Sequence, residues 1–66
     1  MKMSEIHELT QEELARGLDD HRRELFNLRL QAQTGQLENH ARIRQVRRII
    51  ARMLTEETAR QKRQTA

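Results

Sequence analysis

Hydrophobic residues recur every three or four positions in two separate stretches of the chain. In the first stretch they are Leu14, Leu18, Leu25, Leu28 and Ala32, with His21 filling the gap in the series. In the second stretch they are Ile43, Val46, Ile49, Ile50, Met53 and Leu54. At about 100° per residue, each set falls on one face of an α-helix. The pattern therefore predicts an all-α protein built from two amphipathic helices.

Local signals predict where these helices begin and end. The segment from Thr10 to Glu13 reads Thr-Gln-Glu-Glu, which is a capping box that starts the first helix, and Leu9 and Leu14 stand at the positions of a hydrophobic staple. Gly35 suits the left-handed conformation that ends a helix. Asn39 is a favourable N-cap for the second helix. We expect helices at about 10–34 and 39–58, a turn at about 35–38 and a frayed tail at 59–66, where the hydrophobic face has ended.

A turn this short forces the two helices to run antiparallel, with their hydrophobic faces in contact. The predicted fold is a long antiparallel two-helix hairpin with a short N-terminal lead-in. With 66 residues, the chain forms one domain, residues 1–66.

Two features of the first helix leave alternatives open. Gly17 either weakens the helix or permits a close approach of the second helix. Phe26 and Leu30 lie off the leucine series and share an outer side with Arg23 and Asn27. That pair forms either a contact surface for RNA or protein, or a widened core that contacts the lead-in.

Charge is distributed unevenly along the chain. The formal net charge is +3, but residues 1–38 carry a balance of −3 and residues 39–66 a balance of +6. Eleven of the thirteen cations are arginines, whose planar forks of donors suit phosphate oxygens. Arg44, Arg48 and Arg52 follow one another at intervals of four, with no acidic residue between Glu38 and Glu56. Because like charges four apart destabilise a helix, this arrangement predicts an external polyanion, most simply RNA.

The composition argues against several other classes of protein. The chain has no Cys, and His7, His21 and His40 do not form a metal-binding spacing, so we expect no metal and no cofactor. No nucleophile stands beside a base in a recognisable arrangement, and a thin hairpin offers no deep pocket, so we expect no enzyme. The N-terminus lacks the hydrophobic core of a signal peptide, and no hydrophobic run reaches membrane-spanning length. These features favour a cytoplasmic protein.

Three segments carry a specific resemblance to a known family. The segment from Glu24 to Arg29 reads ELFNLR, the segment from Thr34 to Asn39 reads TGQLEN, and the segment from Ala41 to Arg48 reads ARIRQVRR. Over roughly residues 5–55, the chain resembles the universal large-subunit ribosomal protein numbered twenty-nine, in its bacterial form.

The resemblance implies a structural role on the ribosome. Proteins of this family bind large-subunit ribosomal RNA near the exit of the nascent-peptide tunnel, beside the large-subunit protein numbered twenty-three. Chaperones and targeting factors dock in the same region. By match to the motif, the RNA-contact role falls on Phe26, Asn27, Arg29, Thr34, Gly35, Gln36, Asn39, Arg42, Arg44, Arg47 and Arg48. The interval-of-four series adds Arg52, and the outer side of the first helix adds Arg23.

Two departures from the family pattern remain. Ile49 stands where the family commonly has a polar or acidic residue, which widens the hydrophobic face of the second helix. The tail after Met53 departs from the usual continuation, so the resemblance assigns it no function.

Two rival functions follow from the same amphipathic helices. Two hairpins that pair their hydrophobic faces form a four-helix bundle, which makes the chain a self-associating interaction module. A basic amphipathic helix also binds anionic membranes, but this chain has no interfacial Trp and the TGQLEN turn fits that role poorly.

Overall fold

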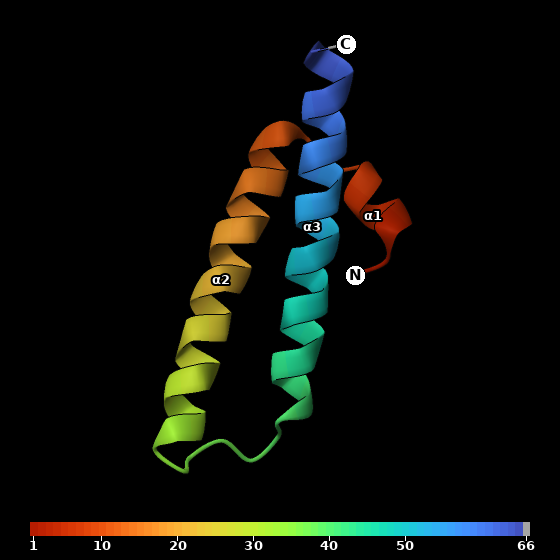
Figure 1. The fold of residues 1–66 in the computed structure, drawn as a ribbon. Coiled ribbons are helices and arrows are strands. Elements are labelled where there is room, and N and C mark those ends of the chain that lie inside the picture. The colour runs from red at the N-terminus through yellow and green to blue at the C-terminus, as the bar shows by residue number, and fades with distance from the viewer. Residues whose placement is uncertain (66) are drawn as a thin grey trace.

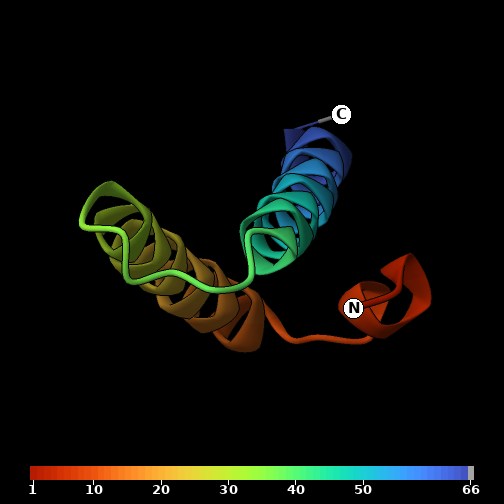
Figure 2. The ribbon, with the colours of Figure 1, turned by 90° about the horizontal axis from the view of Figure 1, so that it is seen from below.

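The computed structural model describes residues 1–65, and this part of the chain contains three helices: α1 (Met3–His7), α2 (Gln11–Gln33) and α3 (Ala41–Thr65). Helices α2 and α3 run antiparallel along most of the length of the molecule, which measures 47 × 17 × 16 Å (Figure 1). A view along the helices shows that α3 lies between α1 and α2 (Figure 2). The all-α prediction is confirmed.

The predicted signals at the two ends of α2 are present in the structure. The Thr10 hydroxyl accepts a hydrogen bond from the Glu13 amide at 3.1 Å, and the Glu13 carboxylate accepts one from the Thr10 amide at 2.9 Å. Gly35 adopts a φ of 75°, the left-handed conformation that costs glycine little. The Gln36 amide then donates to the Gln31 carbonyl at 2.8 Å, as in a Schellman motif, and the chain leaves the helix axis.

The second predicted cap is also present, although α3 starts slightly later than expected. The Asn39 side-chain oxygen accepts a hydrogen bond from the Ala41 amide at 3.0 Å. The Arg42 and Ile43 amides bond to the carbonyls of residues 39 and 40, which completes the first turn. Asn39 therefore supplies an acceptor to one of the amides that have no partner inside the helix.

The hydrophobic core lies at the end of the hairpin where α1 packs. Its buried cluster consists of Ile6, Leu14, Leu18, Ile49 and Met53. A Cβ atom on Gly17 would lie 2.9 Å from the terminal carbon of Met53, so the close-approach interpretation of Gly17 is correct. Toward the loop the two long helices diverge (Figure 1). Leu25, Leu28 and Ile43 are only partly buried there.

The N-terminal lead-in is a helix, and it packs mainly on α3. Ile6 is fully buried in the core cluster, which also contains Ile49. Phe26 and Leu30 stay exposed, at 63% and 45%. The alternative in which they form a widened core under the lead-in is therefore wrong. No periodic pattern marks α1 in the sequence, because a helix of five residues places only one or two side chains in the core.

The prediction of a frayed tail at 59–66 is wrong over the part that the structure describes, because α3 continues to Thr65. Ala66 lies outside the described residues. The extension has few hydrophobic contacts, and polar contacts hold it instead. The Arg60 guanidinium donates to the Leu9 carbonyl at 2.7 Å and to the Glu56 carboxylate at 2.9 Å, which ties the last turns to the N-terminal segment.

Candidate nucleic-acid interface

Three arginines form the outer basic face of α3, which we define as Arg44, Arg47 and Arg48. All three are exposed, and together with Ala51 they line a shallow hollow on the helix surface. At about 100° per residue, Arg44 and Arg48 point away from Val46, which is buried at the contact with α2, and Arg47 points to one side of it. Within residues 1–65 we find no hydrogen bond or ion pair from any of the three side chains. Their donors are available to an external anion.

The local sequence explains why these cations have no partner on their own helix. In an ordinary exposed helix, acidic residues three or four positions away pair with such cations and stabilise the helix by a few tenths of a kcal/mol each, about 0.2–0.5. Here the positions from 39 to 55 contain no acidic residue. The outer basic face therefore combines mutual repulsion with exposure to solvent, and a row of phosphates would relieve that repulsion.

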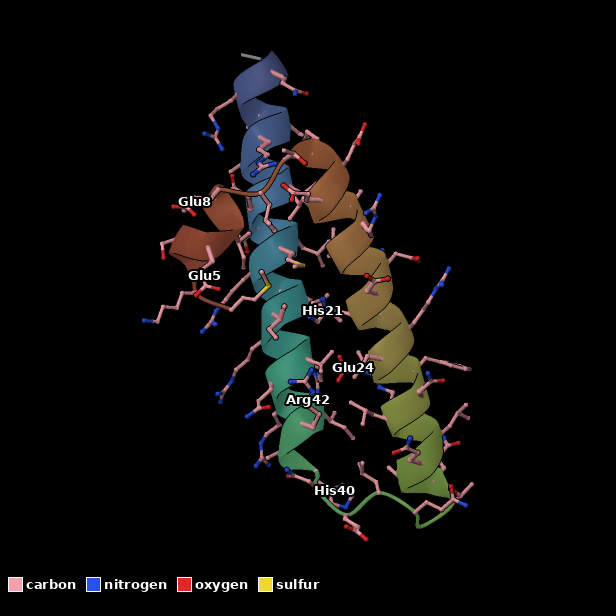
Figure 3. All side chains as sticks on the ribbon, turned by 180° about the vertical axis from the view of Figure 1, so that it is seen from behind. Glu5, Glu8, His21, Glu24, His40 and Arg42 are labelled. Atoms are coloured by element: carbon pink, nitrogen blue, oxygen red, sulfur yellow. The ribbon has the colours of Figure 1, made fainter. Side chains whose placement is uncertain are left out.

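Arg42 has a different role from its neighbours. Its guanidinium donates two hydrogen bonds to the Glu24 carboxylate on α2, at 2.6 and 3.0 Å. Glu24 and Arg42 point toward each other across the gap between α2 and α3 (Figure 3). This hydrogen bond lowers the pKa of Glu24 below its ordinary value of 4.5. Arg42 thus links the two helices near the loop, where hydrophobic burial is weak, and its forked donors already have acceptors.

Two further predicted arginines are engaged within the molecule. The Arg52 guanidinium donates to the Met1 carbonyl at 2.6 Å, which holds the start of the chain against α3. Arg23 forms an ion pair with Asp19, one turn earlier on α2, at 3.1 Å. Both arginines are exposed, so a phosphate can compete with these contacts, but they are less available than the outer basic face.

The predicted residues of the turn have backbone roles. The Thr34 hydroxyl donates to the Leu30 and Gln31 carbonyls at 3.2 and 3.1 Å, and Gly35 supplies the left-handed residue. Gln36 is exposed. The TGQLEN segment therefore builds the cap at the end of α2 and the cap at the start of α3.

On α2 the predicted Phe26, Asn27 and Arg29 are all exposed. Arg22, which the sequence analysis left out, is exposed too. Neither Arg22 nor Arg29 has a hydrogen bond or ion pair to another residue in the described chain. The signal that would have found Arg22 is its position four residues before Phe26, on the same side of a helix.

Sequence reasoning also missed a buried carboxylate. Glu56 is 3% exposed, and its Oε1 atom accepts from Arg60 at 2.9 Å and from Arg63 at 3.2 Å. Its Oε2 atom has no hydrogen-bond partner within residues 1–65. The His7 Nδ1 atom lies 2.5 Å from this oxygen, and the two groups form an ion pair when His7 is protonated. We call His7, Glu56, Arg60 and Arg63 the Glu56 cluster. The hydrogen bond from Arg60 is the main reason that the pKa of Glu56 lies below its ordinary value of 4.5.

These pKa shifts predict how stability depends on pH. Glu24 and Glu56 have lower pKa values in the folded chain than in the unfolded chain, so their contribution is fully present above about pH 4.5 and is lost as the pH falls through their folded pKa values. We expect the Tm measured by circular dichroism to fall between about pH 5 and pH 3. The Glu24→Gln, Glu56→Gln double variant should show a flatter profile from a lower starting Tm. A wild-type Tm that stays constant or rises over this range would contradict the assignment.

Other kinds of site find no support in the part of the chain that the structure describes. None of its helices is long and hydrophobic enough to cross a bilayer. In the same residues, no three His, Asp or Glu side chains come together in a group that could hold a metal ion.

Comparison with known proteins gives a consistent result. Residues 4–60 match the family model described as "Ribosomal L29 protein". The chain is 60% identical over 55 residues to large ribosomal subunit protein uL29 of Rubrobacter xylanophilus, which covers 83% of this chain and 82% of the other. It is also 60% identical over 55 residues to the uL29 protein of Geobacillus stearothermophilus, covering 83% of each chain. The uL29 protein of Desulforamulus reducens is 52% identical over 60 residues, covering 91% of this chain and 92% of the other.

Proposed function

Because this chain belongs to the ribosomal L29 protein family, we propose that it is a structural constituent of the large ribosomal subunit that binds large-subunit ribosomal RNA. The membership confirms the resemblance drawn from the three sequence motifs. It also confirms the prediction that the chain is not an enzyme, and it supports a location on the ribosome in the cytoplasm. In this proposal residues 1–66 act as one helical domain.

The observation that carries RNA binding is the outer basic face of α3. Its three exposed arginines have no partner within residues 1–65, whereas Arg42 and Arg52 do. With Arg22 and Arg29 on α2, the hairpin offers five such arginines to phosphate groups. A hairpin of this length, with caps at both sides of its turn, acts as a stiff support between RNA segments. Recognition of this kind depends on backbone, sugar hydroxyls and the shape of loops more than on base sequence.

The resemblance supports a finer placement for this chain. It favours a position near the exit of the nascent-peptide tunnel, next to the large-subunit protein numbered twenty-three. Chaperones and targeting factors that dock near the exit are further proposed partners.

A salt series tests the proposed function. Affinity is measured for a large-subunit ribosomal RNA fragment and for an unrelated RNA of equal length. We expect a preference for the ribosomal fragment that persists at moderate salt. Five phosphate contacts predict a log–log slope of about −3.5 to −4.5 for the affinity against salt concentration. Equal and steeply salt-sensitive binding to both RNAs would contradict a shaped docking site.

The same samples test the four-helix bundle. The structure disfavours it, because the hydrophobic faces of α2 and α3 already pack on each other and on Ile6. A stable dimer that persists at high salt would favour the bundle over RNA binding.

A further inference from the structure

The side of the hairpin opposite α1 brings cations of both long helices together. Glu24 and Arg42 contact each other on one side of the line where α2 and α3 meet, and at 100° per residue Arg42 lies on the same side of α3 as Arg60, which bonds to α1. On α2, residues rotated about the helix axis in the direction opposite to Glu24 face the other side of the hairpin. On α3, residues rotated in the direction opposite to Arg42 face that same side. We call that opposite side the open side of the hairpin.

Helix geometry assigns residues of α2 to the open side. Counted from the buried Leu18 at 100° per residue, Glu24 is rotated by about 120° in one direction. Arg22 and Phe26 are rotated by about 40° and 80° in the other direction. Arg29 is rotated by about 20° in the same direction as Arg22, which leaves it beside the contact between the helices.

The same count assigns Arg47 of α3 to the open side. Counted from the buried Val46, Arg42 is rotated by about 40° toward the side of α1. Arg47 is rotated by about 100° in the opposite direction. The contacts of Gly17 with Met53 and of Glu24 with Arg42 set the vertical register of the two helices. Arg22 and Arg47 both fall between these two contacts, so they flank the open side at similar heights.

Phe26 is the only aromatic residue of the chain, and 63% of its surface is exposed. It lies one turn from Arg22 and less than one turn from Arg29, and neither arginine has an intramolecular partner in the described residues. A hydrophobic ring on a protein surface is costly to leave in water. An aromatic face between cations matches an unpaired nucleotide, because the base stacks on the ring while the flanking phosphates meet the guanidinium groups. A hydrophobic protein surface would not require the cations.

We propose that Phe26 stacks on an unpaired nucleotide of ribosomal RNA whose flanking phosphates bind Arg22, Arg29 and Arg47. This inference rests on the proposed function and makes it more specific. The proposed contact on the open side is a second RNA contact, in addition to that of the outer basic face of α3. The hairpin then binds RNA across both helices, with base stacking on α2 and phosphate neutralisation on both.

Substitutions at Phe26 in the full chain distinguish stacking from a simple hydrophobic contact. With a large-subunit ribosomal RNA transcript as the probe, Phe26→Ala should weaken binding by roughly 5- to 150-fold. Phe26→Leu should weaken it nearly as much, because leucine has no π-face. Phe26→Trp should retain the affinity, and its indole emission should be quenched when RNA binds. Leu54→Ala, which removes an exposed hydrophobic side chain of α3, is the matched control and should bind as the wild type does.

Three results would overturn this inference while leaving the proposed function intact. They are wild-type affinity in Phe26→Ala, wild-type affinity in Phe26→Leu, and unquenched emission of Phe26→Trp at saturating RNA. Wild-type RNA affinity in Phe26→Leu together with poor incorporation of that variant into ribosomal subunits would assign the ring to a protein neighbour. Loss of the preference for ribosomal RNA in the wild-type salt series would instead reject the proposed function itself. Each variant is exposed at the altered site, so circular dichroism should show unchanged helix content.

Discussion

Replacing Arg44 and Arg48 together with glutamate should abolish incorporation of the protein into large ribosomal subunits while leaving it helical. Both side chains are exposed on the outer basic face and make no hydrogen bond or ion pair within residues 1–65, so the hairpin loses no internal polar contact. Arg44 also lies in the first turn of α3, where negative charge interacts favourably with the helix dipole. On RNA, two attractive contacts become two repulsive ones. The log–log slope of affinity against salt concentration should therefore become less steep by about 1.4 to 1.8, the share of two phosphate contacts.

A control variant with the same change in net charge makes this test specific. Lys2→Glu with Arg16→Glu also lowers the net charge by four, but it alters α1 and the start of α2 instead of the outer basic face. We expect this control to enter subunits and to bind RNA more tightly than the Arg44→Glu, Arg48→Glu double variant. Normal incorporation of the latter variant, judged by mass spectrometry of purified subunits, would reject the assignment of the outer basic face.

The sequence predicted those parts of the fold that depend on neighbouring residues. The capping box at Thr10, the left-handed Gly35 and the cap at Asn39 each need only a few consecutive residues, and each is present. The hydrophobic series also needs only the helical repeat. Leu14 and Leu18 are buried as it predicts, although the residues near the loop are covered less well.

The sequence did not predict contacts between distant polar residues. Helix α1 and the extension of α3 depend on Arg60, which reaches residues about 50 positions away in the chain. No periodicity marks such a contact, and Glu56, which stands four positions before Arg60, reads as one half of an ordinary exposed ion pair. The fold instead brings His7 of α1 against it, and it is 3% exposed.

The same limit applies to the candidate interface. By match to the family motif, the sequence assigns Arg42 and Arg44 the same RNA-contact role. The structure separates them, because Glu24 on the other helix binds Arg42 and nothing in residues 1–65 binds Arg44. Which arginines are available to RNA is a property of how α2 and α3 pack, so it needed the three-dimensional arrangement.

The second large expected effect is the loss of stability when Arg60 is replaced by alanine. The Arg60 guanidinium donates to the Glu56 carboxylate, to the Gln11 side chain at 2.8 Å and to the Leu9 carbonyl at 2.7 Å. It also lies 3.4 Å from the Ile6 and His7 carbonyls, which end α1 and have no partner within that helix. Removing it leaves Glu56 buried beside fewer donors and frees α1 from α3. Because Ile6 then loses its cover, hydrophobic burial is lost together with the polar contacts.

We expect Arg60→Ala to lower the free energy of unfolding by about 1.5–3 kcal/mol, the range for hydrogen bonds that involve a charged group. For a chain of this size that is a large share of the total. Arg63→Ala is the matched control, because Arg63 is mostly exposed and makes one weaker contact to Glu56. Arg60→Lys should recover only part of the loss, since an ammonium group cannot reach five separated acceptors at once. Urea unfolding followed by circular dichroism measures the three variants, and hydrogen exchange at the Ile6 and Leu9 amides reports on α1. Equal stability of Arg60→Ala and Arg63→Ala would show that hydrophobic burial of Ile6 alone holds α1 in place.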